Sequence, residues 1–151
     1  MSEFIKGRTV FKTDHLVCLV KALGDVEPRW TDRIEIHEKA VSLFGYHGDR
    51  RAEVANVIIR REFIGGSSND IGFVSKQDGT VEAIISAFDR RQGRDEEWMN
   101  KLAMHYAYRV AEKQAAKMGA TINKTVNADG TWRVVLRKPE VKAWQHAGRA
   151  W

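Results

Sequence analysis

The chain has 151 residues, of which 43% are hydrophobic and 30% are charged, so it is long enough to form one domain with a substantial core. Its single cysteine, Cys18, excludes an intramolecular disulfide framework and a zinc site built from several cysteines. No apolar run approaches the roughly 18 residues of a membrane span, and the N-terminal segment lacks the apolar core of a secretory signal. We therefore expect a cytoplasmic protein.

The formal net charge is +5, with 25 basic and 20 acidic residues. The acidic and basic residues are interspersed along most of the chain, but the excess of basic residues is concentrated in the segment from Arg133 onward. Such a balance can attract phosphate backbones or acidic partners. It is equally typical of a solvated terminal segment, so both interpretations stay open.

The first predicted element is an amphipathic helix that begins at Thr13 or Asp14, either of which can cap it, and ends at Gly24. Its apolar residues follow the spacing of one helix face and are Leu16, Leu19, Val20 and Leu23. This pattern predicts a helix with one buried face.

Alternating and apolar runs then predict a series of strands. The predicted strands cover residues 34–37, 40–46, 54–62, 71–76 and 81–87. Gly45 and Gly48 permit a turn between the second and the third, and the run Gly65–Asn69 reverses the chain before the fourth. Asp78–Gly79 is a preferred pair for the next hairpin turn.

A second, longer helix is predicted from Asp95 to about Lys117, because acidic residues at its start and lysines at its end suit the helix dipole. Two further strands, 121–126 and 131–136, are joined by a turn at Asp129–Gly130. Pro139 ends regular structure. We therefore predict one domain over residues 1–138, followed by a basic, tryptophan-containing tail at 139–151.

The strands follow one another as hairpins and do not alternate with helices, which indicates antiparallel pairing. The predicted fold is a single-domain α+β structure, in which a twisted antiparallel β-sheet carries two main α-helices packed on one face.

The sequence contains no arrangement that indicates catalysis or a bound metal. No two histidines have the i, i+4 spacing of a metal-binding helix, although His37 and His47 could approach across strands beside Glu38 or Asp49. Cys18 lies on the apolar face of the first helix, where a thiol behaves as a small hydrophobe. We expect no cofactor and no metal, and the sequence leans against an enzyme without excluding one.

Three carboxylates, those of Asp70, Glu82 and Asp89, could supply an acid–base pair. Asp70 stands where a turn meets a strand, and aspartates at such positions commonly bond to the backbone of the turn. A structural role for Asp70 is therefore the simpler interpretation.

Several aromatic and charged side chains could bind a ligand or partner. Aromatic and basic residues together are typical of sites that bind single-stranded nucleic acid. The candidates on the predicted domain are Tyr46, Arg60, Asp70, Tyr106, Tyr108, Arg109 and Trp132. Trp144 and Trp151 in the tail complete the set, because exposed tryptophans are frequent interface anchors. The tail would pack either on its own sheet or on another chain.

Several runs together resemble a known family. They are GYHGDRRAEVANVIIR from Gly45, NDIGF from Asn69, LAMHYAYRVAEKQAAKMG from Leu102 and ADGTWRVVLR from Ala128. The pattern resembles an uncharacterised chloroplast and cyanobacterial reading-frame family, the ycf thirty-five group, whose wider relatives in bacteria and phages are classed as a domain of unknown function. The similarity covers about residues 14–137. Phe44 and Met104 depart from it, since the family tends to have a basic residue and a glutamine there.

The resemblance implies a small soluble α+β domain and names no reaction. The sequence favours an interaction module that binds a protein partner or self-associates. A nucleic-acid-binding protein with a basic aromatic surface is the first alternative, and a binder of a small anionic ligand is the second. The last would require a cleft that holds Arg60, Asp70 and Tyr106 together.

Overall fold

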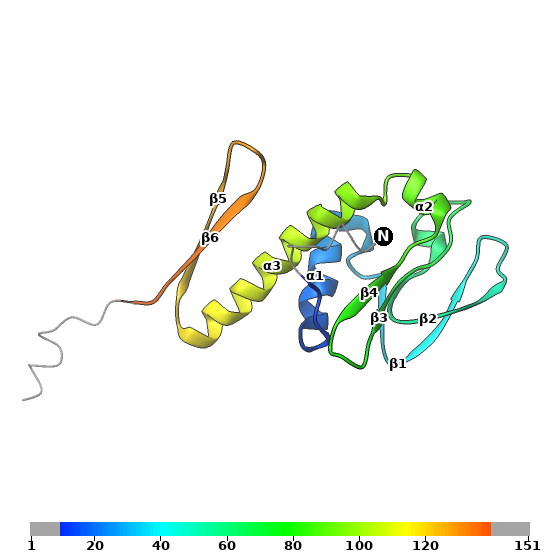
Figure 1. The fold of residues 1–151 in the computed structure, drawn as a ribbon, viewed down its shortest axis with the longest axis horizontal. Helices are drawn as coiled ribbons and strands as arrows, with labels where there is room; N and C mark the ends of the chain where they lie inside the picture. The colour runs from blue at the N-terminus through cyan, green and yellow to red at the C-terminus, as the bar shows by residue number, and fades with distance from the viewer. Residues whose placement is uncertain (1–9, 140–151) are drawn as a thin grey trace, which may run out of the picture. The chain divides into compact units, whose positions relative to one another are not determined.

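The computed structural model describes residues 10–139, which form two compact units, one up to Arg109 and one from Val110 onward (Figure 1). The first unit contains α1 (Leu16–Val26), β1 (Ile34–Phe44), β2 (Arg50–Ile59), β3 (Ile71–Ser75), β4 (Val81–Ile84) and α2 (Ala87–Arg91). Helix α3 (Glu96–Met118) begins in the first unit and ends in the second. The second unit also contains β5 (Thr121–Val126) and β6 (Trp132–Arg137). Short 3-10 turns cover Thr13–His15, Pro28–Trp30 and Arg61–Phe63.

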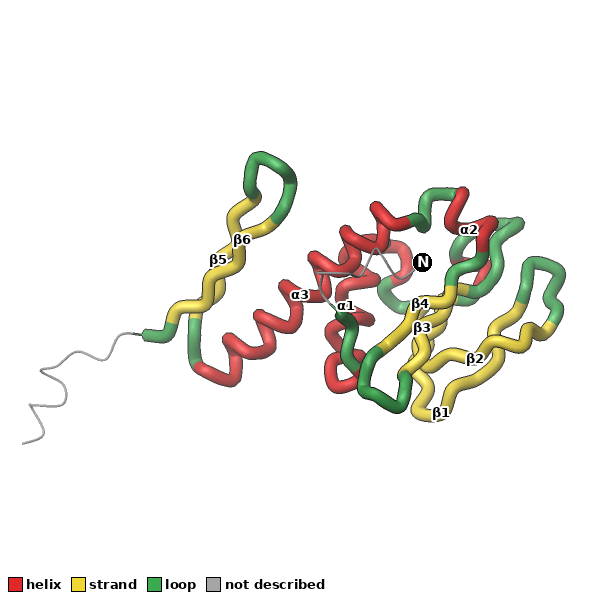
Figure 2. The backbone as a smooth tube through the Cα atoms, viewed as in Figure 1, coloured by secondary structure: helices red, strands yellow, loops and turns green. Residues whose placement is uncertain are grey.

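All four strands of the first unit pair antiparallel in the order β1-β2-β3-β4, which confirms the predicted α+β class. The predicted single sheet also includes the last two strands, and this part of the prediction is wrong. The structure instead pairs β5 with β6 in a two-stranded sheet, drawn as two yellow strands joined by a green loop in Figure 2. A tight turn in which Gly130 takes a φ of +86° closes this hairpin locally.

One face of the four-stranded sheet packs against helices. Phe73 of β3 meets the ring of Phe11 edge-on at 6.2 Å between centroids, and Phe11 in turn meets Tyr106 of α3 at 4.9 Å. Trp30 and Trp98 form a second edge-on pair at 6.1 Å. These aromatic contacts bury the core between the sheet and its helical cover.

Part of the opposite face of the sheet is covered by the end of the β1–β2 hairpin. The strand register shifts after Ile36, where β1 gains extra residues opposite Asn56 of β2. The buried Asn56 amide donates to the carbonyls of His37 and Glu38 and accepts from the Ser75 N–H, so it holds the bulge to β3. Beyond this bulge the hairpin bends over the sheet.

Gly72 marks the point where the bent hairpin touches the sheet. A Cβ at this position would lie 2.6 Å from the Ala55 Cβ and 3.0 Å from a methyl group of Leu43. Leu43, Ala55 and Ile58 form a buried cluster there. Only a glycine permits this approach, and this face of the sheet is therefore partly covered.

Element boundaries differ from the sequence expectations in a few places. Helix α1 begins at Leu16 without a side-chain cap, so the predicted caps Thr13 and Asp14 are wrong; both lie in the preceding 3-10 turn. The helix continues through Gly24 to Val26, and Pro28 begins the next turn. The predicted strands 34–37 and 40–46 are one continuous strand, β1.

The chain after β4 also differs from the expectation, since the predicted strand 81–87 stops at Ile84. Ser86 caps the short helix α2, with its hydroxyl accepting from the Asp89 N–H at 3.1 Å. Helix α3 begins as predicted, and the Asp95 carboxylate accepts from the Trp98 N–H.

Candidate functional site

The carboxylate of Asp70 is the centre of a buried polar network between the β1–β2 hairpin and the sheet. Its side chain is only 1% exposed. Oδ1 accepts from the Arg61 N–H at 2.8 Å, while Oδ2 accepts from the Phe44 N–H at 2.8 Å and from Nη1 of Arg60 at 2.7 Å. The Asp70 N–H also donates to the Phe44 carbonyl. A charge in the interior is tolerable only with such partners.

Arg60 links this carboxylate to the edge strand β1. Its guanidinium forms a bidentate pair with Glu35, at 2.9 and 3.0 Å, and donates to the Ser42 carbonyl. The ring of Phe44 lies under the guanidinium, 5.6 Å from its centroid. Hydrogen bonds from Arg60, together with one from His37, lower the pKa of Glu35. The hydrogen bonds of Arg60 to Glu35 and to Asp70 raise the pKa of Arg60.

Asn69 extends the network toward α2. Its Oδ1 accepts from the Tyr46 N–H at 3.1 Å, and its Nδ2 donates to the Ser86 hydroxyl at 2.9 Å. The Asn69 N–H donates to Oδ2 of Asp89, which is fully buried. Oδ1 of Asp89 has no hydrogen-bond partner among the described residues.

We call Arg60, Asn69 and Asp70 the hairpin latch. Asp70 and Asn69 accept from the backbone on either side of Gly45, at Phe44 and Tyr46, so the latch fixes the end of β1 against the sheet. Both oxygens of Asp70 accept hydrogen bonds from backbone N–H groups, and Oδ2 also accepts one from the Arg60 guanidinium, so the carboxylate has a structural role. That arrangement does not suit an acid–base pair.

Exposed apolar side chains gather on the hairpin that the latch holds. Phe44, Tyr46 and Val54 are 37%, 48% and 41% exposed, and we call them the hairpin patch. Val54 pairs with Ser42, two residues before Phe44, and the strand register shifts again between Ser42 and Phe44. Tyr46 follows in the turn, and its ring stacks on His47 at 3.8 Å.

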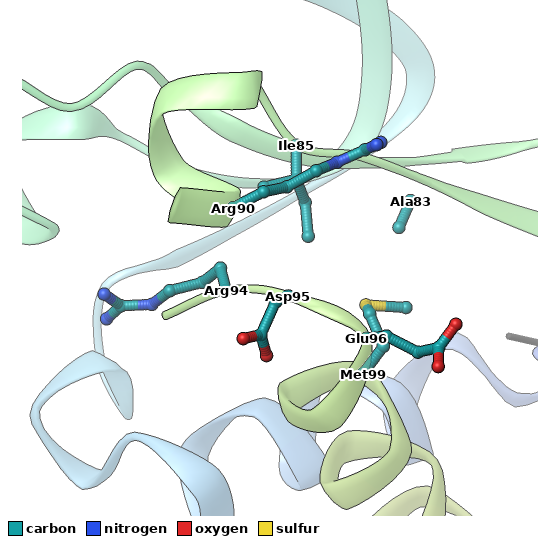
Figure 3. A pocket seen from close by; sticks show the side chains of 7 residues that line it. All are labelled: Ala83, Ile85, Arg90, Arg94, Asp95, Glu96 and Met99. Carbon is teal, nitrogen blue, oxygen red and sulfur yellow. The ribbon is translucent and has the colours of Figure 1, made fainter. Parts of the chain in front are cut away.

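Two small cavities flank the connection between β4 and α2. One, of about 80 Å³, is lined by Asp70 of the latch and by Leu43, Arg51, Glu53, Ile84, Ile85 and Ser86. The other, of about 160 Å³, lies between Ala83, Ile85 and Arg90 on one side and Asp95, Glu96 and Met99 on the other (Figure 3). Arg94 also lines it, but its guanidinium is paired with Glu27 at 2.8 Å and lies over Trp30.

The remaining predicted site residues lie apart from the latch. Tyr106 is 2% exposed in the core, and its hydroxyl accepts from the Lys12 N–H. Arg109 forms a bidentate pair with Asp25 of α1. The structure thus brings Arg60 and Asp70 together and places Tyr106 in a separate, aromatic part of the core.

Further predicted residues lie on the second half of α3 or beyond it. Tyr108 is half-buried on α3, and Trp132 of β6 carries the Lys124 ammonium over its ring at 3.9 Å. Trp144 and Trp151 lie outside the described residues.

Residues 10–139 contain no cluster of three or more histidine, cysteine or carboxylate side chains that could hold a metal ion. His37 bonds to Glu35 and His47 stacks on Tyr46. Within the same residues, none of the helices combines the length and the hydrophobicity needed to traverse a bilayer.

Sequence reasoning did not single out Glu35, Asn56 or Asn69, each of which has a defined structural role. Asn69 could have been found from its position, since it precedes Asp70 in the same turn. Glu35 left no such signal, because its partner Arg60 is 25 positions away. Asn56 left none either, because it bonds to a bulge in β1 that the pattern of residues does not reveal.

The sequence of the chain matches one known protein family. Residues 31–135 match the family model described as "Protein of unknown function (DUF1257)", and the chain belongs to this family. The matched region contains the whole four-stranded sheet and the latch. Neither a curated protein nor a solved structure matches the chain.

Proposed function

We propose that this chain is a non-enzymatic interaction module that binds a protein partner through the hairpin patch. The observation that supports this most is the coincidence of exposed aromatic and aliphatic side chains with a rigidly held hairpin. Aromatic residues are enriched at the centres of protein interfaces.

The latch supports the proposal because a preformed surface loses little conformational entropy on binding. Phe44 and Tyr46 belong to the segment whose backbone N–H groups Asp70 and Asn69 hold. The polar network therefore fixes the backbone of the hairpin patch. In this proposal the carboxylates of the network have a structural role and take part in no reaction.

Affinity capture with the full chain tests this function. We would compare the wild type with Phe44→Ser/Tyr46→Ser, using a lysate of the source organism and quantitative mass spectrometry. Loss of hot-spot aromatics should reduce recovery of the specific partner at least about tenfold, which corresponds to about 1.4 kcal/mol.

A matched control removes exposed apolar side chains elsewhere. Val17→Ser/Val126→Ser replaces residues that are 60% and 65% exposed outside the patch. Equal recovery by the wild type and the patch variant, or an equal loss with the control, would refute the assignment to the hairpin.

The partner could also be a second copy of the chain, and the C-terminal tail with Trp144 and Trp151 could contribute. Light scattering of the full chain and of a chain that ends at Lys138 measures both contributions. A mass above that of the monomer that persists in the shortened chain and disappears in the patch variant would identify self-association through the hairpin.

We further propose that the chain belongs, within its family, to the ycf thirty-five group and its bacterial and phage relatives, and that it acts in the cytoplasm. The runs around Gly45, Asn69 and Leu102 support the first proposal. The lone Cys18, which is a free, buried thiol, suits a reducing compartment.

A further inference from the structure

The net charge of this protein is confined to its second unit. Residues 1–109 contain 17 basic and 17 acidic side chains, whereas residues 110–151 contain eight basic and three acidic ones. The whole excess of +5 therefore belongs to the unit that contains the β5–β6 hairpin. A strong local excess of one sign attracts polyanions.

The two faces of the β5–β6 hairpin differ in chemistry. In the observed register Thr125 pairs with Arg133 and Thr121 with Arg137, and alternation puts these four residues on one face. Asn123 and its partner Val135 share that face, so it has one apolar residue between the two arginines. Arginine, threonine and asparagine are side chains that commonly contact nucleic-acid phosphates.

The polar face carries no competing carboxylate within the described part of the chain. Neither Arg133 nor Arg137 forms an ion pair with any described residue, and both are exposed. The nearby Asp129 lies in the turn, where it accepts from the N–H and hydroxyl of Thr131. The two guanidinium groups are therefore available to an external anion.

We propose that the β5–β6 hairpin binds double-stranded nucleic acid through the face formed by Arg133, Arg137, Thr121, Asn123 and Thr125. The major groove of duplex DNA admits a two-stranded β-ribbon. Arg133 and Arg137 are four residues apart on β6, so they stand about 13 Å apart at the usual rise of a strand. That separation lets the two guanidinium groups contact different phosphates of the duplex.

Fluorescence anisotropy with the full chain tests this inference. The probe is a labelled DNA duplex of about 21 base pairs, roughly two helical turns. A single strand of the same sequence is the second probe. We expect tighter binding to the duplex, with an affinity that falls steeply between about 50 and 200 mM salt.

The decisive variant is Arg133→Gln/Arg137→Gln. Loss of two phosphate contacts should weaken duplex binding about tenfold at low salt and reduce the slope of log affinity against log salt by about 2. Arg133→Lys/Arg137→Lys keeps the charges and should retain most of the slope. Circular dichroism confirms that each variant is folded.

A control variant distinguishes a local site from net charge. Arg91→Gln/Lys101→Gln removes two exposed basic side chains from the first unit, and its salt slope should equal that of the wild type. The proposal is overturned if the wild type does not retain the duplex at low salt, if it prefers the single strand, or if the control lowers the slope as much as the hairpin variant.

Discussion

The side chains of Arg60 and Asp70 meet at 2.7 Å, although the ten positions that separate them include a 3-10 turn and a glycine-rich loop. Arg60 directly follows β2 and Asp70 directly precedes β3, so their ion pair closes the connection between neighbouring strands. Asp70 also accepts from the Phe44 N–H and thereby joins the far end of β1 to the same point. One buried carboxylate thus holds three strands.

Replacing Asp70 by alanine should strongly destabilise the protein. The substitution leaves the Phe44 and Arg61 N–H groups without their acceptor and removes one partner from the Arg60 guanidinium. Breaking such a buried pair costs about 3–5 kcal/mol, measurable as the free energy of unfolding in urea. Glu53→Ala is the control, since its exposed pair with Arg51 should contribute less than about 1 kcal/mol. Equal effects of the two variants would contradict the role of the latch.

Replacing Gly72 by alanine should also destabilise the protein, by about 1–3 kcal/mol, because the new methyl group would overlap the Ala55 Cβ at 2.6 Å. Gly66→Ala is the matched control. It lies in open space and should leave the unfolding midpoint nearly unchanged or slightly raised. A Gly72→Ala variant as stable as the wild type would show that the hairpin does not press on β3.

Local signals in the sequence were sufficient for most of the fold. The predicted turns at Asp78–Gly79 and Asp129–Gly130 are both present, with φ values of +86° at Gly79 and Gly130. The acidic start of α3 is also confirmed. These features depend on neighbouring residues, so a short window of sequence contains their physical cause.

The curled hairpin could not be predicted in the same way. The bulge opposite Asn56 inserts residues into β1 without any glycine or proline to mark it. The contact of Leu43 with Gly72 depends on that bulge. Sequence reasoning identified Asp70 as a turn-bonding residue, but its bond to Phe44, 26 positions away, requires the three-dimensional path of the hairpin.

The stability contributed by Glu35 should depend on pH. Arg60 lowers the pKa of Glu35 in the folded state, so the contribution is fully present above the ordinary pKa of a glutamate, about 4.3. It should be lost as the pH falls through the lowered pKa. The difference in unfolding free energy between the wild type and Glu35→Gln should therefore shrink in acid. A carboxyl NMR titration that places the Glu35 midpoint at or above its ordinary value would refute this.

The buried hydroxyl of Tyr106 should contribute to stability and to the order of the sheet edge. It accepts a hydrogen bond from the Lys12 N–H at 2.9 Å. Lys12 also forms a β-bridge with Thr80, and the neighbouring Phe11 carbonyl accepts from the Val81 N–H. Tyr106→Phe leaves the Lys12 N–H without this partner, so it should cost about 1–2 kcal/mol and speed hydrogen exchange at Val81.

Because of the same hydroxyl, the stabilities of the wild type and of Tyr106→Phe should depend differently on pH in the alkaline range. Burial raises the pKa of Tyr106, so the folded state resists its ionisation and the wild type should lose stability as the pH rises above about 10. The Tyr106→Phe variant should lack this part of the alkaline decline in stability, which urea unfolding across that pH range measures.

Tyr46→Phe is the control at neutral pH. Its ring is 48% exposed, so loss of its hydroxyl should change the stability by less than about 0.5 kcal/mol. An unchanged alkaline profile in Tyr106→Phe would show that the hydroxyl ionises without cost to the fold.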